Sequence, residues 1–142
     1  MVMKKILRSL VFILLVLFFS CEKTGLFIVE CDNCTDSEPE VTGLDIRLDV
    51  NDFGLARINI YEGNIEDSII FASFRAGRSS SVSHTVPINK KYTVTATYDI
   101  EAKRYIAVDA AFPRVKYDED TCEEACYYVY DRILDLRLKY TK

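Results

Sequence analysis

Short stretches of the chain alternate apolar and polar residues, as strands with one buried face do. The clearest stretch covers residues 44–50, where leucine, isoleucine and valine take every second position and charged residues stand between them. Residues 56–60 repeat this alternation after residues 51–54, whose sequence Asn-Asp-Phe-Gly has turn chemistry. Two alternating segments separated by a turn are typical of a β-hairpin, so we predict that these two strands pair with each other.

Further strands are predicted along the chain. Residues 69–74 are β-branched and aromatic. Residues 82–86 form a shorter strand that Pro87 limits, which predicts a sheet edge because proline cannot donate a ladder hydrogen bond. Residues 92–98 and 105–110 flank a charged turn and predict a second hairpin.

A last strand is predicted at residues 134–140, where leucine or tyrosine alternates with charged residues. About seven short strands with turns between them, and no long helical period, favour one all-β domain built as a two-layer antiparallel β-sandwich. We expect this domain to cover residues 41–142. The acidic, proline-containing residues 35–40 read as a tether in front of it.

The start of the chain has the order of a secretory leader. Three basic residues, Lys4, Lys5 and Arg8, precede an unbroken apolar stretch at residues 10–19. Crossing a hydrocarbon layer of about 30 Å takes about 20 apolar residues, and this stretch is too short. We therefore predict a signal peptide rather than a transmembrane span.

Residues 17–21 (Leu-Phe-Phe-Ser-Cys) resemble a bacterial lipobox, the motif that is cleaved before a cysteine carrying diacylglycerol. The resemblance implies that residues 1–20 are removed and that Cys21 becomes a lipid-modified N-terminus. Residues 21–40 would then be a lipid-anchored tether, and the protein would sit at the outer membrane, on its periplasmic or surface-exposed face. Acyl chains contribute about 0.8 kcal/mol per buried methylene, so two or three of them hold a protein almost irreversibly. An ordinary secretory leader is the alternative.

The net charge becomes more negative when the predicted leader is removed. The whole chain has a formal charge of −4, and without the three basic leader residues it is −7. Such a field repels phosphate backbones, and no basic run interleaved with aromatics offsets it. We expect no nucleic-acid partner.

Four cysteines remain besides Cys21, in a compartment where disulfides persist: Cys31, Cys34, Cys122 and Cys126. Two disulfides are the expected state. The alternatives are a four-thiolate zinc site, which mostly belongs to reducing compartments, and a redox Cys-x-x-Cys motif. Four cysteines permit three pairings, which the sequence alone leaves open.

The residues around Cys122 favour one of these pairings. Thr121 and Glu124 have the spacing of a capping box, which predicts a short helical turn near residues 121–126 with Cys122 and Cys126 on one face. Bonds between sequence-distant segments also constrain the unfolded chain more than tiny local loops do. We therefore expect cross-links between the two cysteine clusters.

Candidate chemistry is sparse. The one histidine, His84, shares a strand face with Val82 and Val86 and reads as a half-buried packing residue, so a hydrolase is only a minor alternative. The acidic residues of 118–124 could ligate calcium, but the glycine and ligand spacing of a dedicated loop are missing. We expect no metal, no cofactor and no enzymatic activity.

Two further segments resemble strands of known β-sandwich domains. Residues 56–61 and 89–96 resemble core strands of transthyretin-like, carboxypeptidase-regulatory-like and collagen-adhesin B-type domains. The resemblance implies a β-sandwich fold, and a fold by itself does not assign a function.

The hypothesis that remains is a membrane-anchored, non-enzymatic binding or assembly module whose partner is an envelope protein or glycan. Tyrosine supplies rigid, amphipathic contact area, and the tyrosines here surround an acidic loop. Their packing beneath the disulfides is the competing interpretation. The other possibility is a structural or stalk subunit that self-associates through edge strands. The candidate contact surface consists of Tyr117, Glu123, Glu124, Tyr127, Tyr128 and Tyr130.

Overall fold

The computed structural model describes residues 30–49, 55–77 and 80–139. Within these ranges the chain forms strands joined by turns and two short 3-10 turns, η1 (Cys31–Asn33) and η2 (Ile65–Asp67). The strands are β1 (Val41–Arg47), β2 (Ala56–Glu62), β3 (Ile70–Ala76), β4 (Ser81–Pro87), β5 (Tyr92–Ile100), β6 (Lys103–Ala111), β7 (Arg114–Asp118), β8 (Cys126–Tyr130) and β9 (Ile133–Asp135).

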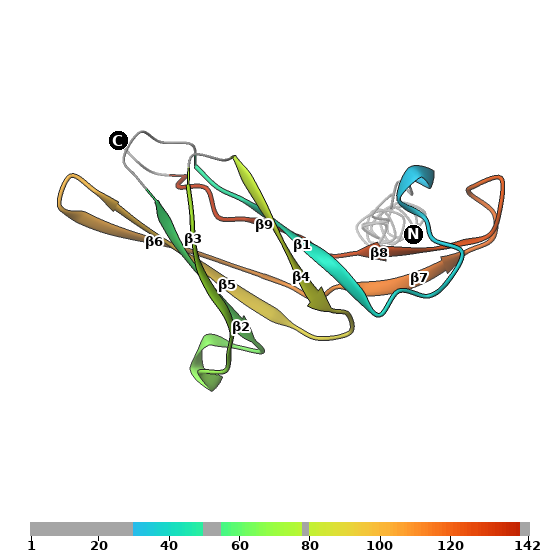
Figure 1. Cartoon of the computed structure of the whole chain (residues 1–142), viewed down its shortest axis with the longest axis horizontal. Coiled ribbons are helices and arrows are strands. Elements are labelled where there is room, and N and C mark those ends of the chain that lie inside the picture. The colour runs from blue at the N-terminus through green and yellow to red at the C-terminus, as the bar shows by residue number, and fades with distance from the viewer. Residues whose placement is uncertain (1–29, 50–54, 78–79, 140–142) are drawn as a thin grey trace, which may run out of the picture.

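Two layers of strands enclose one hydrophobic core (Figure 1). One layer has the order β4-β1-β9 and the other the order β3-β2-β5-β6. The alternation in β1 turns Leu44 and Ile46 inward, and that in β2 does the same for Ile58 and Ile60, all without exposed surface. The predicted all-β sandwich, seven strands in two layers, is confirmed.

The first two strands do not form the predicted hairpin. β1 pairs with β4 and β9, whereas β2 pairs with β3 and β5 in the opposite layer. Alternation fixes which side of a strand faces the core, but two strands facing each other across the core satisfy it as well as two hydrogen-bonded neighbours do. The predicted turn at residues 51–54 lies outside the described residues.

The second predicted hairpin and the predicted sheet edge are both present. β5 and β6 pair antiparallel along their whole length, with Tyr98 opposite Tyr105, and turn through Glu101 and Ala102 in left-handed conformations. β4 is the edge of its layer, next to β1 only. Its residue His84 is half-buried, in agreement with the predicted packing role.

The C-terminal strand is shorter than predicted and pairs in the opposite sense from the other strands. β9 runs parallel to β1, with Ile133 opposite Asp45, while the other pairs among the described strands are antiparallel. Leu136 follows the strand and stays fully buried, and its backbone N–H donates to the carbonyl of Arg47 at 2.9 Å. Leu138 also packs on the core, and Tyr140 lies outside the described residues.

β7 and β8 form a two-stranded hairpin outside both layers (Figure 1). We call β7, β8 and their connecting loop, residues 114–130, the arm. β6 leads into the arm through Phe112 and Pro113, so the arm extends one end of the sandwich, opposite the β5–β6 turn. Among the described residues, the core cluster of the sandwich contains none from the arm, which must therefore be held by other contacts.

Candidate functional site

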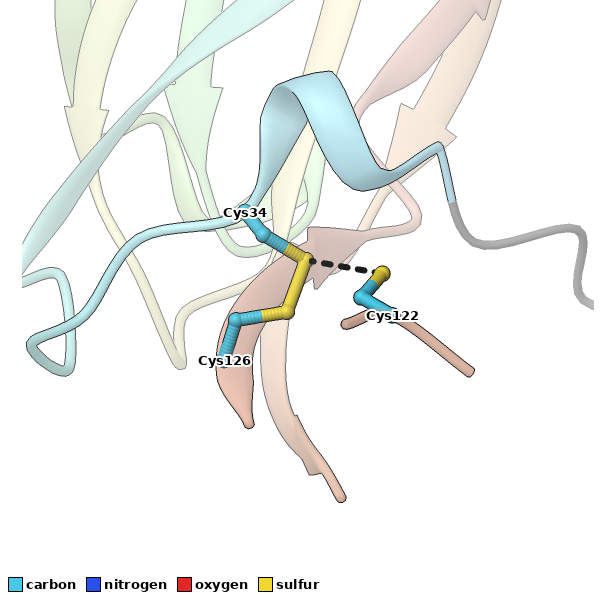
Figure 2. A group of neighbouring side chains, drawn as sticks. All are labelled: Cys34, Cys122 and Cys126. Carbon is cyan, nitrogen blue, oxygen red and sulfur yellow. Dashed lines mark hydrogen bonds between the residues drawn. A yellow bond between two sulfur atoms is a disulfide. The ribbon is translucent and has the colours of Figure 1, made fainter. Parts of the chain in front are cut away.

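All four cysteines expected to form disulfides meet where the N-terminal segment crosses the arm, and Figure 2 shows three of them, Cys34, Cys122 and Cys126. Cys31 is bonded to Cys122, and Cys34 to Cys126. Both disulfides therefore link the two sequence clusters, the arrangement favoured from the sequence. The sulfurs of Cys34 and Cys122, which belong to different disulfides, lie 4.0 Å apart.

Backbone pairing places the cysteines. Cys34 ends η1, where its N–H donates to the carbonyl of Cys31 at 3.2 Å. The next residue, Thr35, exchanges two backbone hydrogen bonds with Tyr127, at 2.9 and 2.8 Å. The bridge joins the two segments one residue away from Cys34 and Cys126, whose Cα atoms lie 5.4 Å apart. The segment predicted as a tether is thus attached to β8 at its N-terminal end.

The loop between β7 and β8 is not helical, so the predicted helical turn near residues 121–126 is wrong. Residues 119–124 are bends. The carboxylate of Asp118 accepts hydrogen bonds from the backbone N–H groups of Asp120 (3.1 Å) and Thr121 (2.8 Å), and from the hydroxyl of Thr121 (2.8 Å). An aspartate that captures backbone donors two and three residues on stabilises a turn instead of a helix start.

The same contacts affect the acidity of Asp118. Hydrogen bonds from the backbone and the hydroxyl of Thr121 stabilise its carboxylate and lower its pKa below the usual range for aspartate. The loop is therefore held by an ionised carboxylate at neutral pH. That carboxylate is already engaged by donors of its own loop, whereas Glu123 and Glu124 are exposed.

The four arm tyrosines divide between two faces of the hairpin. Tyr117 and Tyr127 are register partners on one face, with ring centroids 4.8 Å apart, and Tyr117 is 47% exposed. Tyr128 and Tyr130 are on the other face, with centroids 6.3 Å apart. Tyr128 is only 8% exposed and is therefore not available to a partner. Of the other candidate contact residues, Tyr117, Glu123 and Glu124 are exposed, and Tyr127 and Tyr130 are half-buried.

His84 lies among aromatic rings. Its imidazole stacks on Phe74 with ring centroids 5.4 Å apart, and it meets the edge of Phe71 at 6.0 Å. These contacts join β4 to β3 across the edge of the sandwich, and they explain why a histidine occupies a half-buried position on an otherwise apolar face.

A groove that the sequence analysis missed lies between β6 and the residues after β9. Its volume is about 320 Å³, and its lining includes Tyr105, Ile106, Val108, Asp135 and Lys139. Ile106 and Val108 are 60% and 53% exposed, at positions where a sandwich strand normally carries polar residues. The apolar residues at outward-facing positions of 105–110 are the sequence signal that would have indicated this groove.

No family model matches the chain, and neither a curated protein nor a solved structure matches it. Cys21 lies outside the described residues. Among the described residues no helix is long and apolar enough to cross a membrane.

Proposed function

We propose that this chain is a lipid-anchored, non-enzymatic protein of the bacterial envelope that acts as a binding or assembly module through its arm. The observation that carries the proposal is the construction of the arm. It lies outside the sandwich core and is held by two disulfides and a backbone bridge to the segment that follows the lipidation motif. Covalent attachment of this kind supports a role that depends on how the arm stands relative to the anchor.

The length of the tether limits where the arm would act. Cys31 is ten positions after Cys21, and an extended chain spans at most about 3.6 Å per residue, so the Cys31–Cys122 disulfide would lie within about 36 Å of the lipid. The β5–β6 turn is at the other end of the molecule (Figure 1). A partner reached by the arm would thus be close to the membrane surface.

The chemistry of the exposed arm surface suggests the kind of partner. The Tyr117–Tyr127 pair offers a rigid aromatic patch, and Glu123 and Glu124 add negative charge on the adjoining loop. A surface with these groups fits a partner that offers apolar contacts beside basic side chains. An envelope protein meets this description better than a glycan.

Site-specific photocrosslinking in intact envelopes tests the proposal. A photoreactive residue at position 117 should capture a defined envelope protein, whereas the same residue at position 101, in the distal β5–β6 turn, should not. The combined variant Tyr117→Ser, Glu123→Gln and Glu124→Gln should abolish capture by a crosslinker at position 127. Equal capture from positions 117 and 101, or undiminished capture by the combined variant, would show that the arm is not the contact surface.

The lipid is tested separately. Mass spectrometry of the protein from membranes should find acyl chains on Cys21 as the first residue, and Cys21→Ser should release the domain from the membrane fraction. Protease treatment of intact cells decides whether the domain is on the periplasmic or the exposed face. An unmodified Cys21 would show that the protein is not anchored by a lipid at this residue.

A structural subunit that self-associates is the second candidate, because β4 is an edge strand with β1 on one side only. Edge strands pair with strands of other chains by β-augmentation. Ser83→Pro, at an exposed position whose N–H points away from β1, would obstruct such pairing and should convert any oligomer to monomer in sedimentation velocity. A wild-type protein that is monomeric at high concentration argues against this candidate.

A further inference from the structure

Three of the four cysteine sulfurs already form a compact group, and the fourth is bonded to one of them. The sulfurs of Cys34, Cys122 and Cys126 lie within 4.8 Å of one another (Figure 2), and Cys31, which lies outside this group, is bonded to Cys122. Two sulfurs come from a Cys-x2-Cys segment and two from a Cys-x3-Cys segment. We propose that, once both disulfides are reduced, these four cysteines bind one Zn²⁺ ion as a tetrathiolate.

The distances fit that ion. Zinc binds thiolate at about 2.3 Å, so in a tetrahedral site the sulfurs are about 3.8 Å apart. The unbonded Cys34 and Cys122 sulfurs are 4.0 Å apart, close to this value. The two bonded pairs each need to separate by about 1.7 Å from a normal disulfide length, and the Cys31 sulfur must move towards the sulfurs of Cys34 and Cys126. Rotation about side-chain bonds can supply these changes.

The same distances disfavour disulfide exchange within the cluster. Attack by a freed Cys122 thiolate on Cys34 requires the attacking and leaving sulfurs to be nearly in line. With 4.0 Å between Cys122 and Cys34, a linear arrangement would put the sulfurs of Cys122 and Cys126 about 6 Å apart, given a bond of about 2.05 Å. They lie within 4.8 Å, so the cluster is compact rather than linear.

The backbone would keep the site assembled after reduction. The Thr35–Tyr127 bridge consists of two backbone hydrogen bonds, which reduction leaves chemically unchanged, and it joins the two segments one residue away from Cys34 and Cys126. Cys31 is exposed and Cys34 and Cys122 are half-buried, which gives a reductant and an ion access, while Cys126 is 4% exposed. The acidic loop beside them produces a negative potential that attracts a divalent cation.

The reaction balances with an external dithiol as the reductant. Each protein disulfide accepts two electrons and two protons and becomes two thiols, while the dithiol loses them and becomes a disulfide. Zinc then replaces the four thiol protons, which are released to solvent. The ion thereby takes over the cross-linking of the two clusters.

Cobalt titration tests the site. The full-length chain in detergent is reduced, freed of reductant under anaerobic conditions and titrated with Co²⁺, then with Zn²⁺. We expect one Co²⁺ per chain with the charge-transfer and visible bands of a tetrahedral thiolate complex, full displacement by Zn²⁺, and no binding by the oxidised protein. Cys34→Ser and Cys122→Ser should each weaken binding at least ~100-fold. Cys21→Ser, outside the cluster, should bind as the parent does.

Hydrogen exchange separates a native site from capture of the ion by an unfolded chain. In the reduced zinc form, the amides of Thr35 and Tyr127 should be protected as in the oxidised protein. Free exchange of these amides in the zinc form overturns the proposal. So does more than one ion per chain, a spectrum without thiolate bands, or parental affinity in Cys122→Ser.

Discussion

Removing one disulfide should destabilise the protein much less than removing both, and the difference can be calculated from the chain. The bonds join residues 91 and 92 positions apart. Closing a loop of about 92 residues lowers the entropy of the unfolded chain by about 15.6 cal/mol/K, or about 4.6 kcal/mol at 25 °C. Once one bond exists, the second closes only a small ring made of residues 31–34 and 122–126, about nine residues, and contributes about 2.6 kcal/mol.

Either bond alone therefore holds the long loop. Replacing Cys31 and Cys122 by alanine should lower the free energy of unfolding by about 2.6 kcal/mol, and replacing Cys34 and Cys126 should have a similar effect. Replacing all four should lower it by about 7.2 kcal/mol, about 2 kcal/mol more than the two pairs added together. Such a loss is a large part of the stability of a domain this size.

Urea unfolding measures these differences. The three variants and the parent are followed by circular dichroism, with hydrogen exchange at Thr35 and Tyr127 to check that the arm remains attached to the N-terminal segment. A strictly additive result, with each pair contributing about half of the total loss, would refute the shared-loop reasoning. So would one pair that accounts for the whole effect.

Three other predictions concern the packing and the loop. Tyr98→Phe should lower the free energy of unfolding by about 1–2 kcal/mol in urea, because the buried hydroxyl donates to a backbone carbonyl of the other layer at 2.9 Å. Its register partner Tyr105 provides the control, since Tyr105→Phe should change the free energy of unfolding by less than about 0.5 kcal/mol. Stability should fall as pH rises from about 10 towards 12, because burial, and then a nearby carboxylate, raise the pKa of Tyr92 to about 12 while an unfolded tyrosine ionises near 10. Tyr92→Phe should flatten that pH dependence, and an unchanged slope would contradict the assignment. Asp118→Ala should make residues 119–125 more sensitive to limited proteolysis without shifting the unfolding midpoint of the sandwich, and unchanged cleavage would show that the carboxylate does not hold the loop.

Local patterns were sufficient to locate most strands and to say which side of each faces inward. Leu44 and Ile46 alternate with charged residues, and both are fully buried in β1. Pro87 marked β4 as an edge, and the charged turn between residues 98 and 105 marked the β5–β6 hairpin. These features depend on side-chain period and turn chemistry, which act between residues close in sequence.

The contacts between distant segments could not be read in this way. Alternation does not distinguish a strand across the core from a hydrogen-bonded neighbour, so the separation of β1 from β2 and the parallel pairing of β1 with β9 required the assembled fold. In the arm, the capping-box spacing at Thr121 did not start a helix, because the backbone N–H and the hydroxyl of Thr121, which such a box would use, both donate to the Asp118 carboxylate.

The disulfides were predicted in part from the sequence and required the folded structure for the rest. Their even number and the predicted export of the chain indicated disulfides, and loop entropy favoured bonds between the clusters. Which cysteine of one cluster meets which of the other depends on the bridge between Thr35 and Tyr127, a contact across 92 positions of sequence. Partner choice between remote segments depends on the packing of the whole chain, because many pairings satisfy the same local pattern and only one of them buries all the apolar faces together.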